Sequence, residues 1–474
     1  MATSREHFSS KLGFILAAAG SAVGIGNLVG FPVNAAKNGG GAFLLMYALF
    51  VFLICLPVMI AEMAMGRKTA KEPVGAYKQL SGNSKLWSVA GFLGVITPFM
   101  IAVFYMVITV WIFGYIVLTL AGQLDYLASD VGFGEFINNP YLFVGMLAVM
   151  FIVNIILIAG VKEGIERTAK ILMPLLFIML VVMVIFVLSF DNAMKGLQFF
   201  LVPDLSKITP SVINGALSQA FFSLSLGMGI LITYGSYITY QTNIPNAAKF
   251  VSITDTAVAF VAGLMILPAV FSFNPDINPA QLSDSSVSLI FTFLPKIFLA
   301  LQSSIGYVGA SAVAAFFFLL VFFAAITSLV SITEVPVSYL ITEKNMSRRN
   351  ALFTLMITAG VLTVLATLSF GMVSYFTDFV TYAGSNHSFF DVIYDVFYET
   401  ILPLNGLLLC LFVSYRWKSK KLSAELSQGS EGYINSWLEK YINFALGTFI
   451  PLILLGIFIN TVSHKFFHYS LLGF

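Results

Sequence analysis

Two glycine-rich stretches interrupt segments that otherwise have the composition of membrane helices. The first is GSAVGIGNLVGFPVNAAKNGGGAF, residues 20–43, and the second is SLSLGMGILITYGSY, residues 223–237. A break in a helix frees backbone polar groups, and in hydrocarbon each unsatisfied group costs several kcal/mol. Freed carbonyl oxygens can coordinate a small cation, and the N-terminus of a half-helix can hold a carboxylate. The breaks therefore indicate a site for a cation and a carboxylate together.

The glycines of the first stretch have more than one interpretation. Gly24 and Gly26 permit unusual backbone angles and the close approach of a ligand. The pairs Gly20–Gly24 and Gly26–Gly30 also have the spacing of helix-packing motifs, so this stretch alone is compatible with packing. GIGNLVG does not have the spacing of a nucleotide-binding glycine motif, and no strand precedes it. Neither the two cysteines nor the four histidines have metal-ligand or nucleophile–base spacing, so no enzyme is expected.

The helices that must position these groups follow from the composition. The 474 residues are 59% hydrophobic and only 10% charged, which is too apolar for a soluble chain of this size. Apolar runs of about 20 residues can cross a bilayer as helices. We expect an all-α polytopic membrane protein with about 11 transmembrane helices. The expected spans are 12–36, 42–66, 87–121, 141–160, 168–190, 212–239, 250–273, 306–340, 350–371, 388–415 and 441–461, and residues 276–300 are expected to form an external loop with short helices.

The basic residues predict the orientation. Nineteen lysines and arginines fall on the side of the N-terminus and five on the other side. An excess of positive charge marks the cytoplasmic side of a membrane. We therefore expect a protein of the plasma (inner) membrane with its N-terminus in the cytoplasm and its C-terminus outside. The basic residues thus have a topological role, and no nucleic-acid partner is expected.

The two breaks occupy matching positions in two halves of one transmembrane domain, residues 1–474. They fall in the first helix of each five-helix block, at about 11–190 and 211–415, with an extra helix at about 440–461. Five helices per block place the second block in the opposite orientation, so the repeats are inverted. Interrupted helices at matching positions of two halves indicate a transporter's binding site.

Seven motifs carry a family resemblance, and they occur in order between residues 5 and about 415. They are REHFSSKLGFILAAAGSAVGIGN, NGGGAF, EMAMGR, GIERTAKILMP, FFSLSLGMG, ITYGSY and FFAAITS. Together they resemble the neurotransmitter:sodium symporter family, most closely its bacterial amino-acid transporters with the LeuT fold. The resemblance implies a 5+5 inverted repeat with broken helices 1 and 6, and Na⁺-driven symport by alternating access.

The resemblance also implies two Na⁺ sites. One would use the carbonyl of Ala22, the side chains of Asn27, Ser223 and Asp255, and the substrate carboxylate. The other would use the carbonyls of Gly20, Val23 and Ala324 and the hydroxyls of Thr327 and Ser328. Read without the resemblance, these two hydroxyls could bond back into their own helix.

The implied substrate site is apolar apart from its hydroxyl groups. Tyr105 would hold the substrate carboxylate, and Phe222 would close over the substrate. Monoamine carriers have an aspartate at position 24, so Gly24 implies a neutral, hydrophobic amino acid that brings its own carboxylate. The substrate-binding positions are Ala22, Gly24, Ile25, Gly26, Ile101, Tyr105, Phe222, Ser223, Ser225, Leu226, Met228, Ser328 and Ile332.

Four carboxylates, at positions 62, 255, 334 and 395, fall within apolar segments, where charge is costly and functional roles are common. Glu62 is expected to accept hydrogen bonds from N–H groups of the unwound stretches. Chloride-dependent relatives have asparagine at position 255, with chloride held by residues that match Tyr47, Gln219 and Ser223. Asp255 therefore implies chloride-independent transport, although an acid facing water at a helix end is the alternative.

The gates depart from the family pattern. Arg5 and Tyr237 match an inner latch, but the latch aspartate is replaced by Thr342, with Glu343 beside it as a substitute. The usual outer-gate arginine is replaced by glycine at position 30, which leaves Asp395 without its usual partner. A cationic substrate thus stays open as an alternative.

Other functions also remain as alternatives. They are transport of another amino acid, a proton-coupled carrier of the same fold, a channel, and a receptor-like binder. Proton-coupled carriers often place a lysine near the second ion site, whereas the only lysine of the fifth span, Lys170, lies at its cytoplasmic end. The expected partners are an amino acid, Na⁺ and the lipid bilayer, with the chain acting as a monomer or a homodimer.

Overall fold

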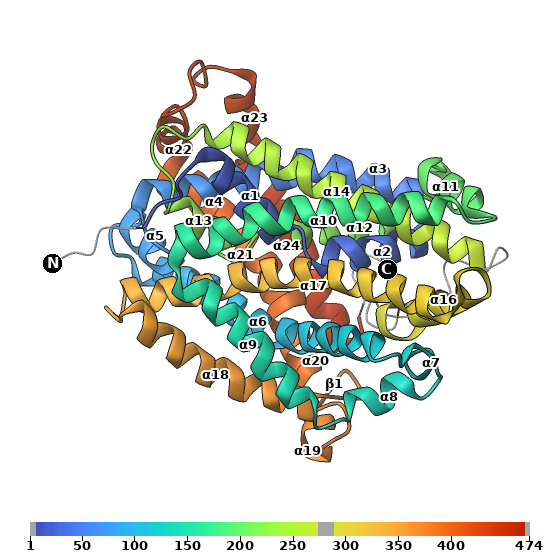
Figure 1. Ribbon diagram of the computed structural model, residues 1–474. Helices are drawn as coiled ribbons and strands as arrows, with labels where there is room; N and C mark the ends of the chain where they lie inside the picture. Colours follow the sequence, from blue (N-terminus) through green and yellow to red (C-terminus); the bar gives the residue numbers. More distant parts are fainter. Residues whose placement is uncertain (1–5, 274–288, 470–474) are drawn as a thin grey trace.

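Long helices packed side by side make up most of this protein (Figure 1). The computed structural model describes residues 6–273 and 289–469. In Figure 1, α5 lies at the end of the bundle near the N-terminus, whereas α7, α8, α11 and α16 lie at the opposite end. The two strands of the described residues, β1 (Val380–Tyr382) and β2 (Ser385–His387), pair as an antiparallel hairpin at the edge of the bundle.

The first half of the chain contains the first broken helix. Its helices are α1 (Lys11–Ala22), η1 (Gly26–Gly30), α2 (Phe31–Lys37), α3 (Gly41–Phe50), η2 (Val51–Cys55), α4 (Leu56–Thr69), α5 (Pro73–Leu80), α6 (Lys85–Leu120), α7 (Leu124–Leu127), α8 (Gly132–Ile137), α9 (Leu142–Ile158), η3 (Val161–Glu166), α10 (Arg167–Leu188), α11 (Ala193–Leu201) and η4 (Leu205–Lys207). Most of the η segments are π-helical turns that continue a neighbouring α-helix, a form often found at functional sites.

The second half contains the second broken helix and the C-terminal helix. Its helices are α12 (Pro210–Ser223), α13 (Ile230–Gly235), α14 (Ile244–Phe273), η6 (Leu289–Phe293), α16 (Leu294–Ala300), α17 (Gln302–Thr342), α18 (Arg348–Leu368), α19 (Ser374–Thr377), α20 (Phe389–Ile393), η7 (Tyr394–Ile401), α21 (Leu402–Leu411), η8 (Phe412–Lys418), α22 (Ser419–Leu426), α23 (Trp437–Gly447) and α24 (Phe449–Phe467).

The helices confirm the prediction of an all-α polytopic membrane protein. Among the described residues, eight helices are long and apolar enough to cross a membrane, and the bent pair of Lys11–Ala22 with Gly26–Lys37 makes a ninth. The two remaining predicted spans correspond to the shorter α9 and to α12 with α13. In the predicted loop 276–300, η6 and α16 confirm short helices at its end, and its first part lies outside the described residues.

Both predicted breaks are present, and each has a local cause. Helix α1 ends where Val23 takes an extended conformation (φ −74°, ψ 98°), and the chain then turns by 53° into η1 and α2. Between α12 and α13 the backbone takes positive φ at Ser225 (55°), Gly227 (73°) and Gly229 (66°). A right-handed helix cannot continue through left-handed residues, and glycine adopts that conformation at least cost.

Packing brings the two breaks to the same depth in the bundle. Helix α1 packs against α10, α14 and α17, while α12 packs against α3 and α13 against α4. The Ser225 hydroxyl in the second break donates a hydrogen bond to the Ser21 carbonyl beside the first break (3.1 Å). The freed backbone groups of both breaks therefore share one buried space.

Candidate binding site at the two helix breaks

In the first break, neighbouring side chains satisfy the freed N–H groups. The Gly24 N–H donates to Asn27 Oδ1 (3.1 Å), and the Ile25 N–H donates to the Tyr105 hydroxyl (3.2 Å). Gly24 has no room for a side chain, because a Cβ there would lie 2.6 Å from Ser328 Oγ and 2.7 Å from the Tyr105 oxygen. The absence of a side chain at position 24 thus lets two hydroxyls approach the backbone.

In the second break, two buried side chains hold the peptide groups of Gly227. Its N–H donates to Glu62 Oε1 (2.9 Å), which confirms the role expected for this carboxylate. Its carbonyl accepts a hydrogen bond from Asn405 Nδ2 (2.9 Å), which also donates to Thr97 Oγ1 (3.0 Å). Asn405 was not among the predicted site residues, and the only signal in the sequence was a lone amide in an apolar segment.

The side chains expected at the first Na⁺ site do come together. Asp255 is fully buried and accepts hydrogen bonds from Asn27 Nδ2 (2.7 Å), Ser223 Oγ (2.9 Å) and the Tyr47 hydroxyl (2.8 Å). Carboxylate, hydroxyl and amide oxygens are the hard ligands that suit a small cation. Asn27 presents its Nδ2 to Asp255 and Ser223 and its oxygen to the Gly24 N–H, so ligation by the oxygen beside Asp255 would require the amide to flip.

The residues expected at the second Na⁺ site face one another across α1 and α17. The Ser328 hydroxyl lies within hydrogen-bonding distance of the Ser21 (3.2 Å) and Val23 (3.5 Å) carbonyls. A Cβ at Gly20 would lie 3.5 Å from Thr327 Cβ. The Thr327 hydroxyl donates to the Ala324 carbonyl of its own helix (3.0 Å). In this structure it therefore bonds back into its helix, as the alternative to Na⁺ coordination expects.

A small cavity of about 20 Å³ lies where these groups meet, with room for about one water molecule. It is lined by Ser21, Ala22, Gly24, Gly26, Tyr105, Phe222, Ser223, Ser225, Met228, Ser328 and Ile332. Ile101 and Leu226, also expected at the substrate site, are fully buried and do not line it, and Ile25 lines the larger cavity described next. An amino acid is far larger than one water molecule, so this site must expand to bind one.

Ser21 lines this cavity but was not identified from the sequence. Its carbonyl accepts from both Ser225 and Ser328, and its own buried hydroxyl has no hydrogen-bond partner among the described residues. The only sequence signal was its position between two expected ligands, Gly20 and Ala22.

A larger cavity of about 570 Å³ lies on the other side of Phe222, and it is called the outer cavity below. Phe222, Tyr105 and Gly26 line both cavities. The Phe222 ring packs edge-on against Tyr398, with 4.5 Å between ring centroids. Phe222 therefore has the position expected of a side chain that closes over the small cavity.

Only part of the predicted inner latch can be located in the structure, because Arg5 lies outside the described residues. The Tyr237 hydroxyl donates to Glu334 Oε1 (2.7 Å), and Arg348 forms an ion pair with the same carboxylate (2.6 Å). Glu343, suggested as a substitute in the latch, instead contacts Lys78 at 3.4 Å.

Lys170, the lysine considered for a proton-coupled carrier, forms an ion pair with Glu166 (2.6 Å).

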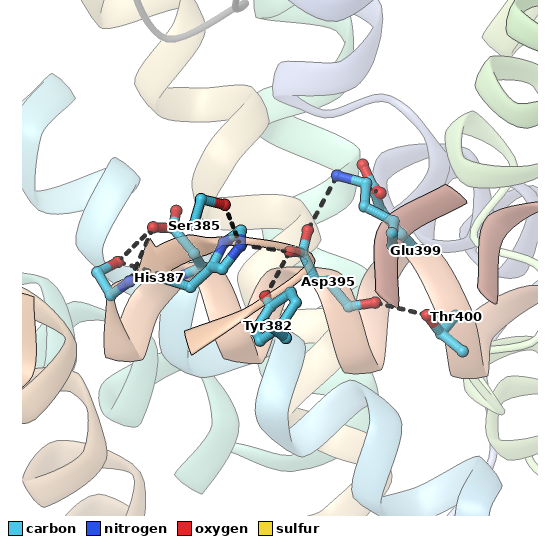
Figure 2. A network of polar contacts seen from close by, with 9 residues as sticks. Tyr382, Ser385, His387, Asp395, Glu399 and Thr400 are labelled. Atoms are coloured by element: carbon cyan, nitrogen blue, oxygen red, sulfur yellow. Dashed lines mark hydrogen bonds and ion pairs between the residues drawn. The ribbon is translucent and has the colours of Figure 1, made fainter. Parts of the chain in front are cut away.

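Asp395, which was expected to lack its usual arginine partner, pairs with a different cation. Lys465 of α24 contacts Asp395 Oδ1 at 3.0 Å, and the Tyr382 hydroxyl donates to Oδ2 (2.6 Å; Figure 2). Burial and the neighbouring Asp395 carboxylate raise the pKa of Tyr382 above its ordinary value, so the phenol stays a donor. A lysine of the C-terminal helix thus pairs with Asp395 where position 30 provides no arginine.

Comparison with known proteins gives one family. The family model described as the sodium:neurotransmitter symporter family matches residues 5–139 and 132–471. A sodium-dependent transporter of Bacillus subtilis (strain 168) is 33% identical over 465 residues, covering 96% of this chain and 97% of that protein. The human sodium- and chloride-dependent taurine transporter is 26% identical over 340 residues, covering 62% of this chain and 54% of that protein.

A solved structure extends the similarity to three dimensions. The crystal structure of MhsT in complex with L-phenylalanine superposes with a TM-score of 0.83 at 39% sequence identity. The match covers 96% of this chain and 99% of that one.

Proposed function

Because this chain belongs to the sodium:neurotransmitter symporter family, whose members are transporters and not enzymes, we propose that it carries a neutral, hydrophobic amino acid together with Na⁺. We further propose two Na⁺ sites, chloride-independent coupling and a cytoplasmic N-terminus. The observation that carries the proposal is the meeting of both helix breaks at one small cavity beside the buried Asp255.

The chemistry of this cavity supports an amino acid as the substrate. The Tyr105 hydroxyl and the backbone of the first break offer polar contacts for a carboxylate. The side chains of Met228 and Ile332 supply an apolar part of the cavity wall. Position 24 faces the Tyr105 and Ser328 hydroxyls and carries no acid, so a substrate without its own carboxylate would find no anionic partner there. The phenylalanine bound to the similar MhsT fits this chemistry.

Asp255 supports chloride independence. Its carboxylate is fully buried and accepts hydrogen bonds from Asn27, Ser223 and Tyr47. Two of these, Tyr47 and Ser223, match residues that hold chloride in chloride-dependent relatives. A fixed negative charge at this place balances a bound Na⁺, so no anion has to enter. The same carboxylate could take up a proton after Na⁺ leaves.

The two cavities support alternating access. The outer cavity is large, whereas the site beneath Phe222 is contracted around about 20 Å³. Two Na⁺ ions per cycle would each contribute about 2.3 kcal/mol at 100 mV and about 1.4 kcal/mol from a tenfold gradient. The total of about 7 kcal/mol is enough for accumulation on the order of 10⁵-fold.

The test is binding and uptake by the purified protein in liposomes. Each of the twenty amino acids is offered in Na⁺ or K⁺ medium, with chloride present or replaced by gluconate. We expect Na⁺-dependent, saturable uptake of large apolar amino acids that does not change in gluconate. Uptake driven by a proton gradient in K⁺, or an ion conductance without counterflow, would overturn the proposal. Loss of uptake in gluconate would overturn only the role given to Asp255.

A further inference from the structure

A buried cluster of charges lies beside the outer cavity, separate from the contracted site. Its centre is Asp395, which is 4% exposed and lies in the π-helical turn η7 (Figure 2). Lys465, in the last turn of α24, contacts Asp395 Oδ1 at 3.0 Å and Glu399 Oε2 at 2.7 Å. One ammonium group therefore bridges two carboxylates that are one helical turn apart.

The other titratable groups near this cluster do not replace the lysine. His387 Nδ1 lies 3.9 Å from Asp395, and His464 lines a neighbouring cavity. The two acids and Lys465 carry a formal net charge of −1. Without Lys465 the same group would carry −2, with both carboxylates unpaired.

Glu399 connects this cluster to the path of a solute. It lines the outer cavity together with Lys37 and Asp391, whose charges cancel. It also lines a second cavity of about 400 Å³, together with His464 and Lys465. Loss of the charge on Lys465 would therefore change the net charge beside the outer cavity from −1 to −2.

We propose that Lys465 is a specificity-determining residue: by pairing with Asp395 and Glu399 it keeps the outer cavity from concentrating cations, and so disfavours cationic amino acids. The part of the proposal that concerns amino acids rests on the function proposed above, whereas the effect on cations in general does not. Lys465 acts on solutes in the cavity through the two carboxylates that it neutralises.

The first experiment measures the potential of the outer cavity directly in the full-length protein. Ile108 lines this cavity, and the native Cys55 and Cys410 are fully buried, so Ile108→Cys provides one accessible thiol. Its rate of modification is measured with an ammonium-bearing and with a sulfonate-bearing methanethiosulfonate. The ratio of the two rates reports the local potential and needs no transport.

The expected ratios separate charge from packing. Lys465→Gln should raise the cation-to-anion rate ratio by about tenfold at low salt and less at high salt, because exposed charges are screened. Lys465→Arg should keep the wild-type ratio, and so should Lys195→Gln, since that exposed lysine lines neither cavity. The double variant with Lys465→Gln and Glu399→Gln should return toward the wild-type ratio. A ratio within twofold of wild type in Lys465→Gln, or an unchanged high ratio in the double variant, would overturn the proposal.

The second experiment tests specificity. L-Lysine is offered as a competitor of Na⁺-dependent L-phenylalanine uptake. We expect the concentration for half-inhibition to fall by about tenfold in Lys465→Gln and to recover when Glu399→Gln is added. An unchanged half-inhibition concentration together with a raised labelling ratio would overturn the specificity role. Absence of phenylalanine uptake in the wild type would instead count against the proposed function, and the labelling arm would still decide the electrostatic claim.

Discussion

The two helix breaks share a Gly-x-Gly sequence but use it for different physical reasons. In the second break, Gly227 and Gly229 adopt positive φ, which other residues adopt only at a cost. In the first break, Gly24 and Gly26 keep ordinary φ values and instead provide space. A Cβ at Gly26 would lie 2.9 Å from the Phe222 ring, and one at Gly24 would meet two hydroxyls.

The difference lies in the glycines, since residues of both breaks line the small cavity. Gly24 and Gly26 of the first break line it too, and the side chains that a Cβ there would meet belong to its wall. In the second break, Glu62 accepts a hydrogen bond from the Gly227 N–H, and Asn405 donates one to the Gly227 carbonyl. Substitution of the glycines in the first break should therefore alter binding, and substitution of the glycines in the second break should alter folding.

The largest effect is expected for Gly227→Ala. The left-handed φ of 73° costs an alanine about 1–2 kcal/mol. The new Cβ would also lie 2.7 Å from the Leu402 carbonyl, a backbone atom that cannot move aside. We expect a loss of more than about 3 kcal/mol, seen as a low yield of folded protein and a strongly lowered Tm in detergent.

A matched control separates conformation from collision. Gly122 has the same φ of 73°, but a Cβ there would meet none of the described residues within 4 Å. Gly122→Ala should cost only about 1 kcal/mol and should leave uptake intact. If Gly122→Ala lowers Tm as much as Gly227→Ala does, the collision with Leu402 is not the cause.

The next effect is expected for Asn405→Leu, which removes the donor from the Gly227 carbonyl while keeping a side chain of similar volume. A buried carbonyl left without a donor costs about 1–3 kcal/mol, so Tm should fall by several degrees. Thr97→Val is the control, because it removes one acceptor of Asn405 and leaves the bond to Gly227 in place. Equal losses in both variants would mean that the Gly227 contact is not special.

The expected effect of Gly24→Ala is smaller on stability and larger on binding. The atoms in its way, the Tyr105 and Ser328 hydroxyls, are the ends of side chains and can shift. Overpacking of this kind costs about 1–3 kcal/mol, which we expect as a tenfold to hundredfold weaker binding of L-phenylalanine in Na⁺. Equilibrium binding and a Tm scan on the same sample measure both quantities. Unchanged affinity with a lowered Tm would assign this glycine to helix packing.

The sequence predicted the helices and the break positions well, because both depend on local composition. The expected span 87–121 corresponds to α6 (Lys85–Leu120), and both glycine stretches are broken where expected. The span 388–415 was too short, since the helical stretch continues to Leu426 through charged residues that end an apolar run without ending a helix. Asn27 and Ser223 were also predicted, because they lie in the family motifs, and Asp255 was noticed as an acid within an apolar segment.

The contacts that the sequence did not reveal join residues that are distant along the chain. Lys465 lies 70 positions after Asp395, and the sequence indicated only that both lie toward the outer end of their helices. Their contact depends on how α24 packs against η7, which no local pattern specifies. Asn405 was missed for the same reason, since its partners lie on α6 and in the second break.

The smallest effect is expected for Thr327→Val. This variant tests whether the hydroxyl only bonds back into its own helix or also binds Na⁺. In this structure the hydroxyl donates to the Ala324 carbonyl of its own helix, a bond worth little because that carbonyl already belongs to the helix. If the hydroxyl also binds Na⁺, its loss should weaken Na⁺ activation of uptake by about fivefold, or about 1 kcal/mol, with Tm nearly unchanged. Thr327→Ser retains the hydroxyl and should behave like the wild type. An unchanged Na⁺ dependence in Thr327→Val would restrict this residue to helix packing, and would leave the ion contacts on that side of the first break to Ser328 and the backbone carbonyls.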